Sequence, residues 1–559
     1  MASSKPDKQP VEQLEKVPPQ IHLAEQLRLK GDLKEALKVT EKFLGENYEH
    51  VPALVMAAHI HADAKKLGIA QALLKLATML RPDSSLVWSD LGFCYQEGQD
   101  LKEGERCFVK ALQRNPNNAM ALNNLSQLYV NTAQPMKAIN CADKAIRLDP
   151  SLPDSHYNRG LAMLQLGNWE EGWKGYEYNL GKHKGRKERT YGIIPRWTGV
   201  KGLTLIAYGE QGIGDEISFA SCLPDLAKEN NVIVECDSRL LGLFSRSFPE
   251  CLVYGTRYQE GIEWPHKHEI DASVAFGSLP GFYRKKDEDF PGTPYLKADP
   301  QRRLMYRALL DSLGPKKKIG IAWAGGRKDT GAARRSMLLY DLAPVLRQDA
   351  TFISLNYRDA EETVLVEENH GLKVHHWPFA TMTKDYDDTA ALVAELDLVI
   401  TVTQAVVHLA GGLGVPCWVM VPKEPMWRYR LNGPDFLWAK SVKLYRQRNE
   451  WVHIVAEVAS DLRKWLNGGH QSHAAAEKGD TKAGGSGKDI ARQAASGSPR
   501  AQEAARQNET RPAPAEASIP GDALEGAEMG AGEPAEGEGS EITLGAREPG
   551  EDQRSSAPL

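Results

Sequence analysis

The stretch GEQGIGDE at 209–216 combines three glycines with acidic residues where the chain passes from one predicted element to another. It follows the apolar run LTLIAY at 203–208 and precedes ISFASCLPDL at 217–226, a pattern that predicts a strand, a loop and then a helix. Ligands of open α/β sheets bind at the carboxyl ends of the strands. A carboxylate there can remove a proton from a hydroxyl group, and flanking glycines let a substrate come close to the backbone. We therefore expect Asp215 to act as a general base.

The spacing of the glycines excludes two common phosphate-binding loops. Gly209, Gly212 and Gly214 read G-x-x-G-x-G, whereas a dinucleotide fingerprint reads G-x-G-x-x-G and a P-loop ends in Lys followed by Ser or Thr. The carboxylate of Asp215 would also repel a nucleotide phosphate. A second role for Asp215 is to cap the helix that follows it, and the two roles are compatible.

The composition indicates a multidomain protein whose partners are not nucleic acids. The 559 residues suffice for about two to four domains, and 42% of them are apolar, which allows ordinary cores. The formal net charge of −5 gives no general attraction to a phosphate backbone. We therefore expect no nucleic-acid partner.

The cysteines and the apolar segments indicate a soluble cytoplasmic protein. The 7 cysteines are scattered, with no C-x-x-C pair, which favours a reducing compartment and predicts no metal site. The N-terminal segment MASSKPDKQPVEQLEK lacks the apolar region of a signal peptide. The longest apolar region, 396–422, contains Asp397, Gln404 and His408, so it predicts a strand, a helix and a strand instead of a membrane span.

The first third of the chain repeats at a step of 34 residues. The unit 85–118 resembles the tetratricopeptide (TPR) pattern of two antiparallel helices, and carries Trp88, Leu91, Gly92, Tyr95, Phe108, Ala111 and Pro116 at the matching positions. One column holds only small residues, which let the two helices of a pair cross closely: Ala36, Ala70, Gly104, Ala138 and Gly172. We expect about five units over 17–186, the outermost ones degenerate.

A stack of TPR units forms a groove that holds a peptide or a partner domain. The sixth position of three successive units carries Asp90, Asn124 and Asn158. The overall layout is similar to the O-linked N-acetylglucosamine transferases, in which an asparagine ladder at that position holds the backbone of the protein substrate. Asparagine is also common there in TPR units generally, so a ladder and an ordinary repeat position both remain open. We expect a protein or peptide partner in this groove.

Beyond residue 190 the repeat ends and short apolar strands alternate with helical stretches. The predicted strands form two groups, 203–208, 231–235, 252–254 and 270–274, and then 318–323, 351–355, 372–375, 397–402 and 416–421. Alternation of this kind predicts two Rossmann-like lobes, with a seam near 299–316. The last ninety or so residues consist mainly of Ala, Gly, Glu, Pro and Ser, a composition that predicts disorder.

The second half resembles the GT-B glycosyltransferases, and specifically the heptosyltransferase-like glycosyltransferase family 9. The resemblance covers about 195–466 and rests on motifs in order: G-I-G-D at 212–215 with SCLPDL at 221–226, IGIAWAGG at 319–326, RRSMLL at 334–339, FISLN at 352–356, and 387–422. The expected fold class is a multidomain α plus α/β protein: an all-α TPR solenoid, a GT-B pair of Rossmann-like lobes and a disordered tail. Its expected segments are 1–16 (disordered), 17–186 (TPR array), 195–298 (acceptor-side lobe), 316–466 (nucleotide-sugar lobe) and 468–559 (disordered).

The resemblance implies an inverting transferase that moves a sugar from a nucleotide sugar to an acceptor hydroxyl, without metal or cofactor. Asp215 would be the base, in a loop with Glu210, Gly212 and Gly214. The donor would be bound by the second lobe, where a helix beginning near Gln404 offers free N–H groups to phosphate. The donor-binding residues implied are Gly325, Arg334, Arg335, Thr403, Gln404, His408, Gly411 and Gly412.

This sequence departs from the family at Thr403-Gln404, where Asp-Ser or Asp-Thr is usual. The change keeps hydrogen-bonding groups but removes a carboxylate, so a catalytically degenerate lobe on a TPR scaffold stays open as the alternative function. A transferase with a glycan acceptor is a third hypothesis. Trp427 and Arg428 match a family segment near the cleft, with aromatic packing as the other interpretation, and Asp388 is expected to be the N-cap of a helix over 389–396.

Overall fold

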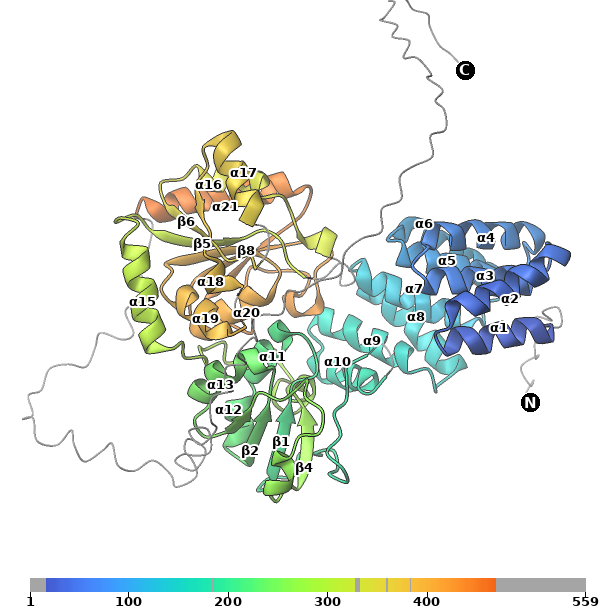
Figure 1. Cartoon of the computed structure of the whole chain (residues 1–559), viewed down its shortest axis with the longest axis horizontal. Coiled ribbons are helices and arrows are strands. Elements are labelled where there is room, and N and C mark those ends of the chain that lie inside the picture. The colour runs from blue at the N-terminus through green and yellow to red at the C-terminus, as the bar shows by residue number, and fades with distance from the viewer. Residues whose placement is uncertain (1–16, 183–184, 327–331, 358–359, 383, 469–559) are drawn as a thin grey trace, which may run out of the picture. The chain divides into compact units, whose positions relative to one another are not determined.

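The computed structural model describes residues 17–182, 185–326, 332–357, 360–382 and 384–468. An array of helices, α1 to α10, is followed by two parallel sheets with their own helices (Figure 1). This confirms the expected fold class. The segments expected to be disordered, 1–16 and 468–559, lie outside the described residues except for Gly468.

The helical array consists of antiparallel pairs, as the 34-residue step predicts. Their bounds are α1 Pro19–Leu29, α2 Leu33–Glu46, α3 Val51–Asp63, α4 Leu67–Leu80, α5 Ser85–Glu97, α6 Leu101–Arg114, α7 Ala119–Asn131, α8 Pro135–Leu148, α9 Pro153–Leu166 and α10 Trp169–Tyr176. The small residues stand where helices touch. A Cβ added to Gly92 would lie 2.8 Å from the Phe108 ring, and one added to Gly160 would lie 2.7 Å from the Cα of Gly175. The repeat is therefore a packing requirement, because larger side chains would separate each pair.

The first sheet has strand order β3-β2-β1-β4, with all pairs parallel. Its strands are β1 Thr204–Tyr208, β2 Asn231–Glu235, β3 Leu252–Tyr254 and β4 Ala272–Ala275. Its helices are α11 Ile213–Ala220, α12 Leu223–Ala227, α13 Leu241–Ser247 and α14 Pro280–Tyr283. Because all four strands are parallel, the loops after β1 and β4 lie at the same edge of the sheet.

The second sheet has strand order β10-β9-β8-β5-β6-β7, again with all pairs parallel. Its strands are β5 Lys318–Ala322, β6 Thr351–Ser354, β7 Val374–His375, β8 Leu398–Val402, β9 Cys417–Val421 and β10 Val442–Arg446. Its helices are α15 Pro300–Asp311, α16 Ala343–Leu346, α17 Ala360–His370, α18 Pro378–Thr381, α19 Tyr386–Ala394, α20 Ala405–Leu413 and α21 Trp451–Leu466.

The expected strands all occur within two residues of their predicted ends, and one strand, β10, was not predicted. The expected seam at 299–316 is occupied by α15, which packs on α19. The expectation that Asp388 caps a helix over 389–396 is wrong. The helix α19 begins at Tyr386, Asp385 is its N-cap, and Asp388 instead pairs with Arg302 of α15 at 2.9 Å.

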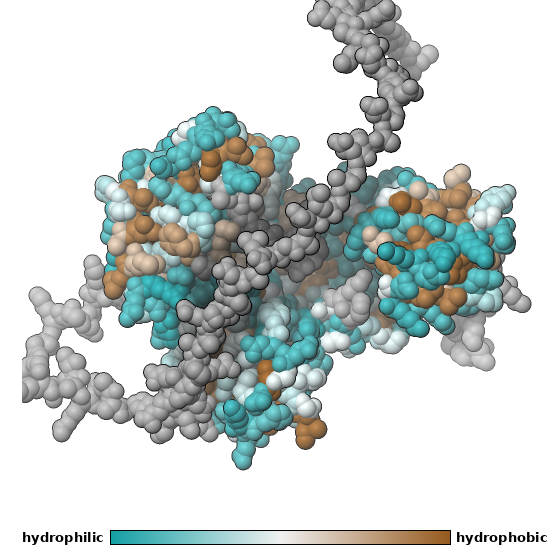
Figure 2. Space-filling model, viewed as in Figure 1, coloured by the Kyte–Doolittle hydropathy of each residue, from teal (hydrophilic) through white to brown (hydrophobic). Residues whose placement is uncertain are grey.

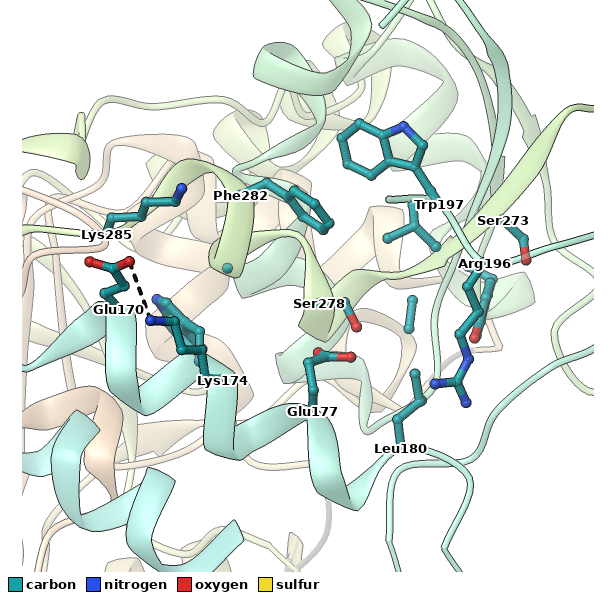
Figure 3. A pocket seen from close by; sticks show the side chains of 15 residues that line it. Glu170, Lys174, Glu177, Leu180, Arg196, Trp197, Ser273, Ser278, Phe282 and Lys285 are labelled. Carbon is teal, nitrogen blue, oxygen red and sulfur yellow. Dashed lines mark ion pairs between the residues drawn. The ribbon is translucent and has the colours of Figure 1, made fainter. Parts of the chain in front are cut away.

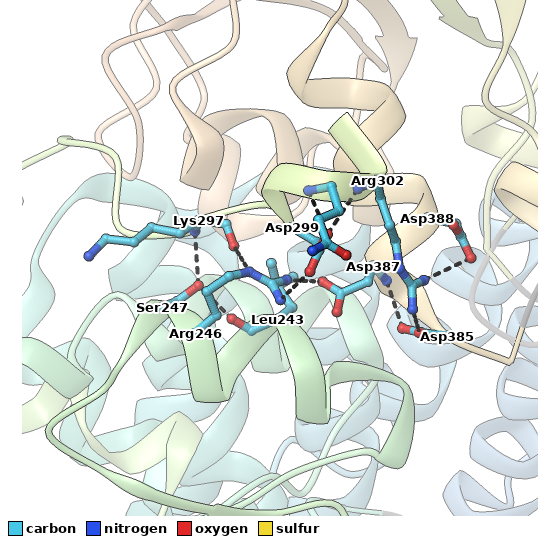
Figure 4. Close-up of polar contacts among 10 residues, drawn as sticks. Leu243, Arg246, Ser247, Lys297, Asp299, Arg302, Asp385, Asp387 and Asp388 are labelled. Atoms are coloured by element: carbon cyan, nitrogen blue, oxygen red, sulfur yellow. Dashed lines mark hydrogen bonds and ion pairs between the residues drawn. The ribbon is translucent and has the colours of Figure 1, made fainter. Parts of the chain in front are cut away.

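A network of ion pairs joins α13 of the first lobe to the second lobe (Figure 4). Arg246 pairs with Asp387 of α19 and with Asp299, the N-cap of α15, the latter at 3.4 Å. Arg302 of α15 pairs with Asp385 at 2.6 Å as well as with Asp388. The two helices α15 and α19 are thereby fixed to each other and to the first lobe.

Hydrophilic and hydrophobic residues are interspersed over the visible face of the helical array (Figure 2). Exposed apolar residues are spread over several of its helices, for example Leu29, Met79 and Met120. Within the described ranges no helix is both long and apolar enough to cross a bilayer.

Candidate functional site

The glycine loop 209–212 leads directly from β1 into α11, as its sequence predicts. Gly212 is the N-cap of α11, so Asp215 is the third residue inside the helix and does not precede it. Its Oδ2 accepts the Gly212 N–H at 3.1 Å. The carboxylate therefore satisfies a free N–H at the start of the helix, and its capping role is carried out from within the first turn.

The other oxygen of this carboxylate pairs with an arginine of the second lobe. Oδ1 of Asp215 lies 2.7 Å from Nη2 of Arg428, whose side chain is 4% exposed against 30% for that of Asp215. The guanidinium lies over the rings of Phe219 and Trp427, with Cζ 4.7 and 4.4 Å from their centroids. Its Nε is buried without a hydrogen-bond partner in the described part of the chain. The pair therefore bridges the lobes and leaves part of the guanidinium available.

Gly214 allows the loop to approach the helix predicted to bind the donor. A Cβ at this position would lie 3.0 Å from Cα and 3.1 Å from Cβ of Ala405, the first residue of α20, and 3.6 Å from Cδ2 of His408. Only glycine leaves room for this approach. The N-terminal turns of α11 and α20, one from each lobe, consequently pack against each other.

Three neighbouring strands of the second sheet, β8, β5 and β6, end at the same edge. Gly325 follows β5, Asn356 follows β6 and Thr403 follows β8. Thr403 is 2% and Asn356 3% exposed, yet the Thr403 hydroxyl and both amide atoms of Asn356 have no hydrogen-bond partner among the described residues. Because buried polar atoms are nearly always hydrogen-bonded, such a group at a sheet edge is suited to a ligand.

Gln404 is the N-cap of α20, but its side chain does not cap the helix. Its amide donates to Oγ1 of Thr401 at 3.0 Å, so the first N–H groups of α20 are not capped by this side chain. A Cβ at Gly325 would lie 2.7 Å from the Cβ of Gln404, so the glycine turn after β5 lies directly against this residue. An anion at this turn would meet the free end of a helix dipole.

The remaining expected donor residues of α20 face the interior of the lobe. His408 is buried beside the stacked rings of Tyr429 and Phe436, and burial together with the nearby Arg428 charge lowers its pKa to about 3. Cβ atoms at Gly411 and Gly412 would lie 2.6 Å from Ala439 and 2.7 Å from Leu296. The structure thus gives these two glycines packing roles, and His408 is a neutral imidazole at ordinary pH.

The two arginines after β5 point to different partners. Nη1 of Arg334 donates to the backbone oxygen of Asn131 in α7 at 3.4 Å, and this side chain is exposed. Nη1 of Arg335 donates to Sδ of Met426 at 3.3 Å. Burial lowers the pKa of Arg335, while Tyr429 and Asp215 oppose this shift. Arg335 therefore lies near the loop carboxylate, and Arg334 contacts the helical array.

Glu210 is a buried structural residue of the loop. Its side chain is 1% exposed, pairs with Nε of Arg186 at 3.0 Å and accepts the Gly277 N–H at 3.0 Å. Gln211 donates to the same carboxylate at 2.9 Å and accepts a hydrogen bond from Tyr176 of α10 at 2.8 Å. The loop is consequently held by the last helix of the array.

The three residues expected to form the groove ladder differ in exposure. Asp90 is partly exposed and lies 3.4 Å from His59, and Asn124 is also partly exposed. Asn158 is 4% exposed and donates to Oδ1 of Asn123 at 3.2 Å. Asn158 thus links α9 to α7, and only Asp90 and Asn124 face accessible space.

Comparison with known proteins defines the helical array. Residues 136–167 match the TPR repeat family and residues 107–140 match the tetratricopeptide repeat family. The array is a TPR array. The curated protein FlbA of Caulobacter vibrioides is 27% identical over 496 residues, which are 78% of this chain and 82% of FlbA. A match of that extent includes both the TPR array and part of the α/β region, so this chain is homologous to FlbA across both.

Other relatives match a smaller share of this chain. The tetratricopeptide repeat-containing protein trd-1 of Caenorhabditis elegans is 25% identical over 126 residues, 22% of this chain and 16% of trd-1. The crystal structure of MamA is 22% identical, covers 28% of this chain and 91% of the MamA chain, and has a TM-score of 0.25.

Several residues of the site were not singled out by the sequence. Asn356 closes the FISLN motif, where its position after a strand was the available signal. Arg186, Gln211 and Tyr176 had no signal, because their roles depend on contacts between the TPR array and the first lobe. The described ranges also contain no cluster of three or more His, Cys, Asp or Glu side chains arranged to hold a metal ion.

Proposed function

We propose that this protein is an inverting glycosyltransferase that moves a sugar from a nucleotide-sugar donor to an acceptor hydroxyl. The observation that carries the proposal is the meeting of Asp215 and Arg428 between the lobes, beside the N-terminus of α20. The buried, unpaired polar atoms of Thr403 and Asn356 at the described edge of the second sheet support a ligand there.

The reaction would use one carboxylate as the base. Asp215 takes the proton of the acceptor hydroxyl while the hydroxyl oxygen bonds to the anomeric carbon of the sugar. On the opposite face, the bond from that carbon to the leaving phosphate oxygen breaks. Each carboxylate oxygen has a second lone pair, so Asp215 can accept this proton while bound to Gly212 and Arg428. The N–H groups of α20 and the charge of Arg335 would stabilise the leaving phosphate.

The TPR array would recruit a protein acceptor or partner. TPR stacks bind polypeptides along their inner helices, and Asp90 and Asn124 are accessible in this array. The contact of Arg334 with α7 connects the donor-side loop to the array. The partner is therefore expected to bind close to the reacting groups.

The test uses the full-length protein and its Asp215→Asn variant. Both are mixed with UDP-, GDP-, ADP- and CMP-sugars in EDTA, and thermal shift and nucleotide release are measured. We expect one donor to stabilise both proteins. The parent should release nucleotide slowly with water in place of the acceptor hydroxyl, and the variant should not, because the amide cannot accept the proton of the attacking water. Asp311→Asn, which changes an exposed aspartate near the end of α15, is the control and should behave as the parent. Release that survives in Asp215→Asn would contradict the assigned base.

The alternative is a TPR scaffold with a degenerate transferase region. It is favoured by Thr403-Gln404, since Gln404 is engaged with Thr401 and no carboxylate stands there. The same screen separates the two functions, because a scaffold would bind the donors weakly or not at all and would release no nucleotide. A glycan acceptor would instead give nucleotide release that a glycan stimulates and a polypeptide does not.

A further inference from the structure

A cavity of about 250 Å³ opens between the TPR array and the first lobe (Figure 3). One wall is the C-terminal part of the array, α10 and the following turn, and the other consists of β4, α14 and the segment before β1. It is separate from the sheet edge that carries Thr403 and Asn356, because none of its lining residues belongs to the second lobe.

The floor of this cavity is aromatic. The rings of Trp197 and Phe282 lie 4.4 Å apart at an angle of 40°, and Trp173 and Tyr208 add further rings to the lining. The indole N–H groups of the two tryptophans are already bound, Trp173 to the oxygen of Arg284 and Trp197 to that of Val200. The floor therefore offers apolar surface and few free donors.

The rim carries charges of both signs. Glu170 and Glu177 face Lys174, Arg196 and Lys285, and Lys174 lies 3.4 Å from Glu170. Because Arg196 is also paired with Glu188, these three cations meet three carboxylates and the rim carries little net charge. A nucleotide or another polyanion needs concentrated positive charge, so this rim does not favour one.

The cavity wall is connected to the loop that holds Asp215. Glu177 and Ser278, both lining residues, bind Arg186 at 3.0 and 2.8 Å, and Arg186 pairs with Glu210 at 3.0 Å. A molecule in the cavity thus contacts Glu177 and Ser278, which are connected through Arg186 to Glu210 of the glycine loop.

We infer that this cavity binds an aromatic or bulky aliphatic side chain of a polypeptide partner. An apolar cavity of about 150 Å³ is enough to hold benzene, so the larger volume here accommodates a ring together with its attachment to a backbone. The apolar floor suits the side chain and the mixed rim suits the polar backbone around it. The inference rests on the proposed function only in taking this polypeptide to be the acceptor.

The test measures binding and needs no sugar transfer. The full-length protein is examined by saturation-transfer NMR with the N-acetyl amides of Phe, Leu, Glu and Lys, and with glucose and N-acetylglucosamine. We expect the Phe and Leu amides to receive saturation and the others not. The blocking variant is Gly281→Leu, since a Cβ at this lining glycine lies 3.5 Å from Trp173, an ordinary contact, so the added side chain grows into the cavity.

Two controls separate blocking from general damage. Gly68→Leu adds the same side chain to an exposed helical glycine with open space around it and should keep the signal. Phe282→Ala removes half of the ring pair and should lose the signal even if Gly281→Leu fails to fold. Equal signals in the parent and both cavity variants would overturn the inference, as would no signal from any amide or a stronger signal from the sugars. Loss of transfer with these signals intact would count against the proposed reaction alone.

Discussion

Arg428 and Arg284 are both almost fully buried, but their N–H groups are used differently. Arg284 donates to the backbone oxygens of Tyr283 and Ser221, each at 2.9 Å, and pairs with Asp225 at 2.8 Å. Arg428 has its ion pair with Asp215, while its Nε has no hydrogen-bond partner in the described structure. A buried arginine with an unsatisfied nitrogen costs stability unless a ligand completes its hydrogen bonds.

Exchange of these two arginines for methionine should therefore affect stability and activity differently. Arg428→Met removes a buried charge and leaves Asp215, 30% exposed, accessible to water, so the free energy of unfolding should change by less than about 1 kcal/mol while sugar transfer is lost. Arg284→Met leaves two carbonyls unpaired and should cost about 3 kcal/mol. Urea unfolding and nucleotide release measure both effects. A large loss of stability in Arg428→Met would indicate a structural role.

The hydroxyl of Thr403 allows a second test, which measures stability and donor binding and needs no sugar transfer. Thr403→Val replaces a buried hydroxyl that has no partner in the described structure, so the unliganded protein should become more stable by about 1 kcal/mol and the stabilisation by donor should decrease. Thr401→Val is the matched control, because that hydroxyl donates to Val402 and accepts from Gln404. It should lower the melting temperature. Equal destabilisation in both variants would mean that Thr403 has no ligand-binding role.

At the scale of elements, the sequence predicted most of the framework. The repeat and the strands are local patterns, set by close packing at positions such as Gly92 and by apolar runs such as 203–208. The strand β10 was not predicted because Lys443 and Arg446 interrupt its apolar residues. Asp388 was misplaced because Asp385, three residues earlier, is also a good N-cap residue. The ion pair of Asp215 with Arg428 could not be predicted, because it forms only when the two lobes pack together and no short stretch of sequence encodes that packing.

The helix α20 carries a pH dependence that can be measured. The pKa of His408 is lowered to about 3 by burial and by Arg428, so the folded state takes up its proton only far below the pH at which the unfolded chain does. The stability contributed by neutral His408 is complete above the unfolded pKa of about 6.5 and is lost as the pH falls toward 3.

Between pH 7 and pH 5 the free energy of unfolding of the parent should fall by about 2 kcal/mol more than that of His408→Leu. Urea unfolding across this range gives the two slopes, and carboxylates common to both proteins cancel in the difference. Parallel slopes for the parent and His408→Leu would show that this imidazole is not held neutral by the fold.

At the scale of the whole molecule, the last TPR pair is part of the α/β core. Trp173 of α10 packs on Trp427 of the second lobe with centroids 5.2 Å apart, and Tyr176 lies 5.8 Å from the same ring. Trp169 donates to Asp287 at 2.6 Å, and Tyr176 donates to Gln211 at 2.8 Å. These contacts support a proposal that differs from the expectation of a TPR array ending at 186: we propose that the boundary between the TPR array and the α/β region falls before α9.

Two shortened chains distinguish these boundaries. Residues 149–468 keep α9 and α10, whereas residues 187–468 lack both. Three buried aromatic side chains, Trp169, Trp173 and Tyr176, contribute on the order of 10 kcal/mol by burial, comparable with the whole stability of a domain. The longer chain should unfold cooperatively and keep its stabilisation by donor, while the shorter one should aggregate or unfold without a transition. If 187–468 melts as sharply as 149–468, the TPR array is a separable module, and contact between its last helix and the glycine loop has no part in holding Asp215.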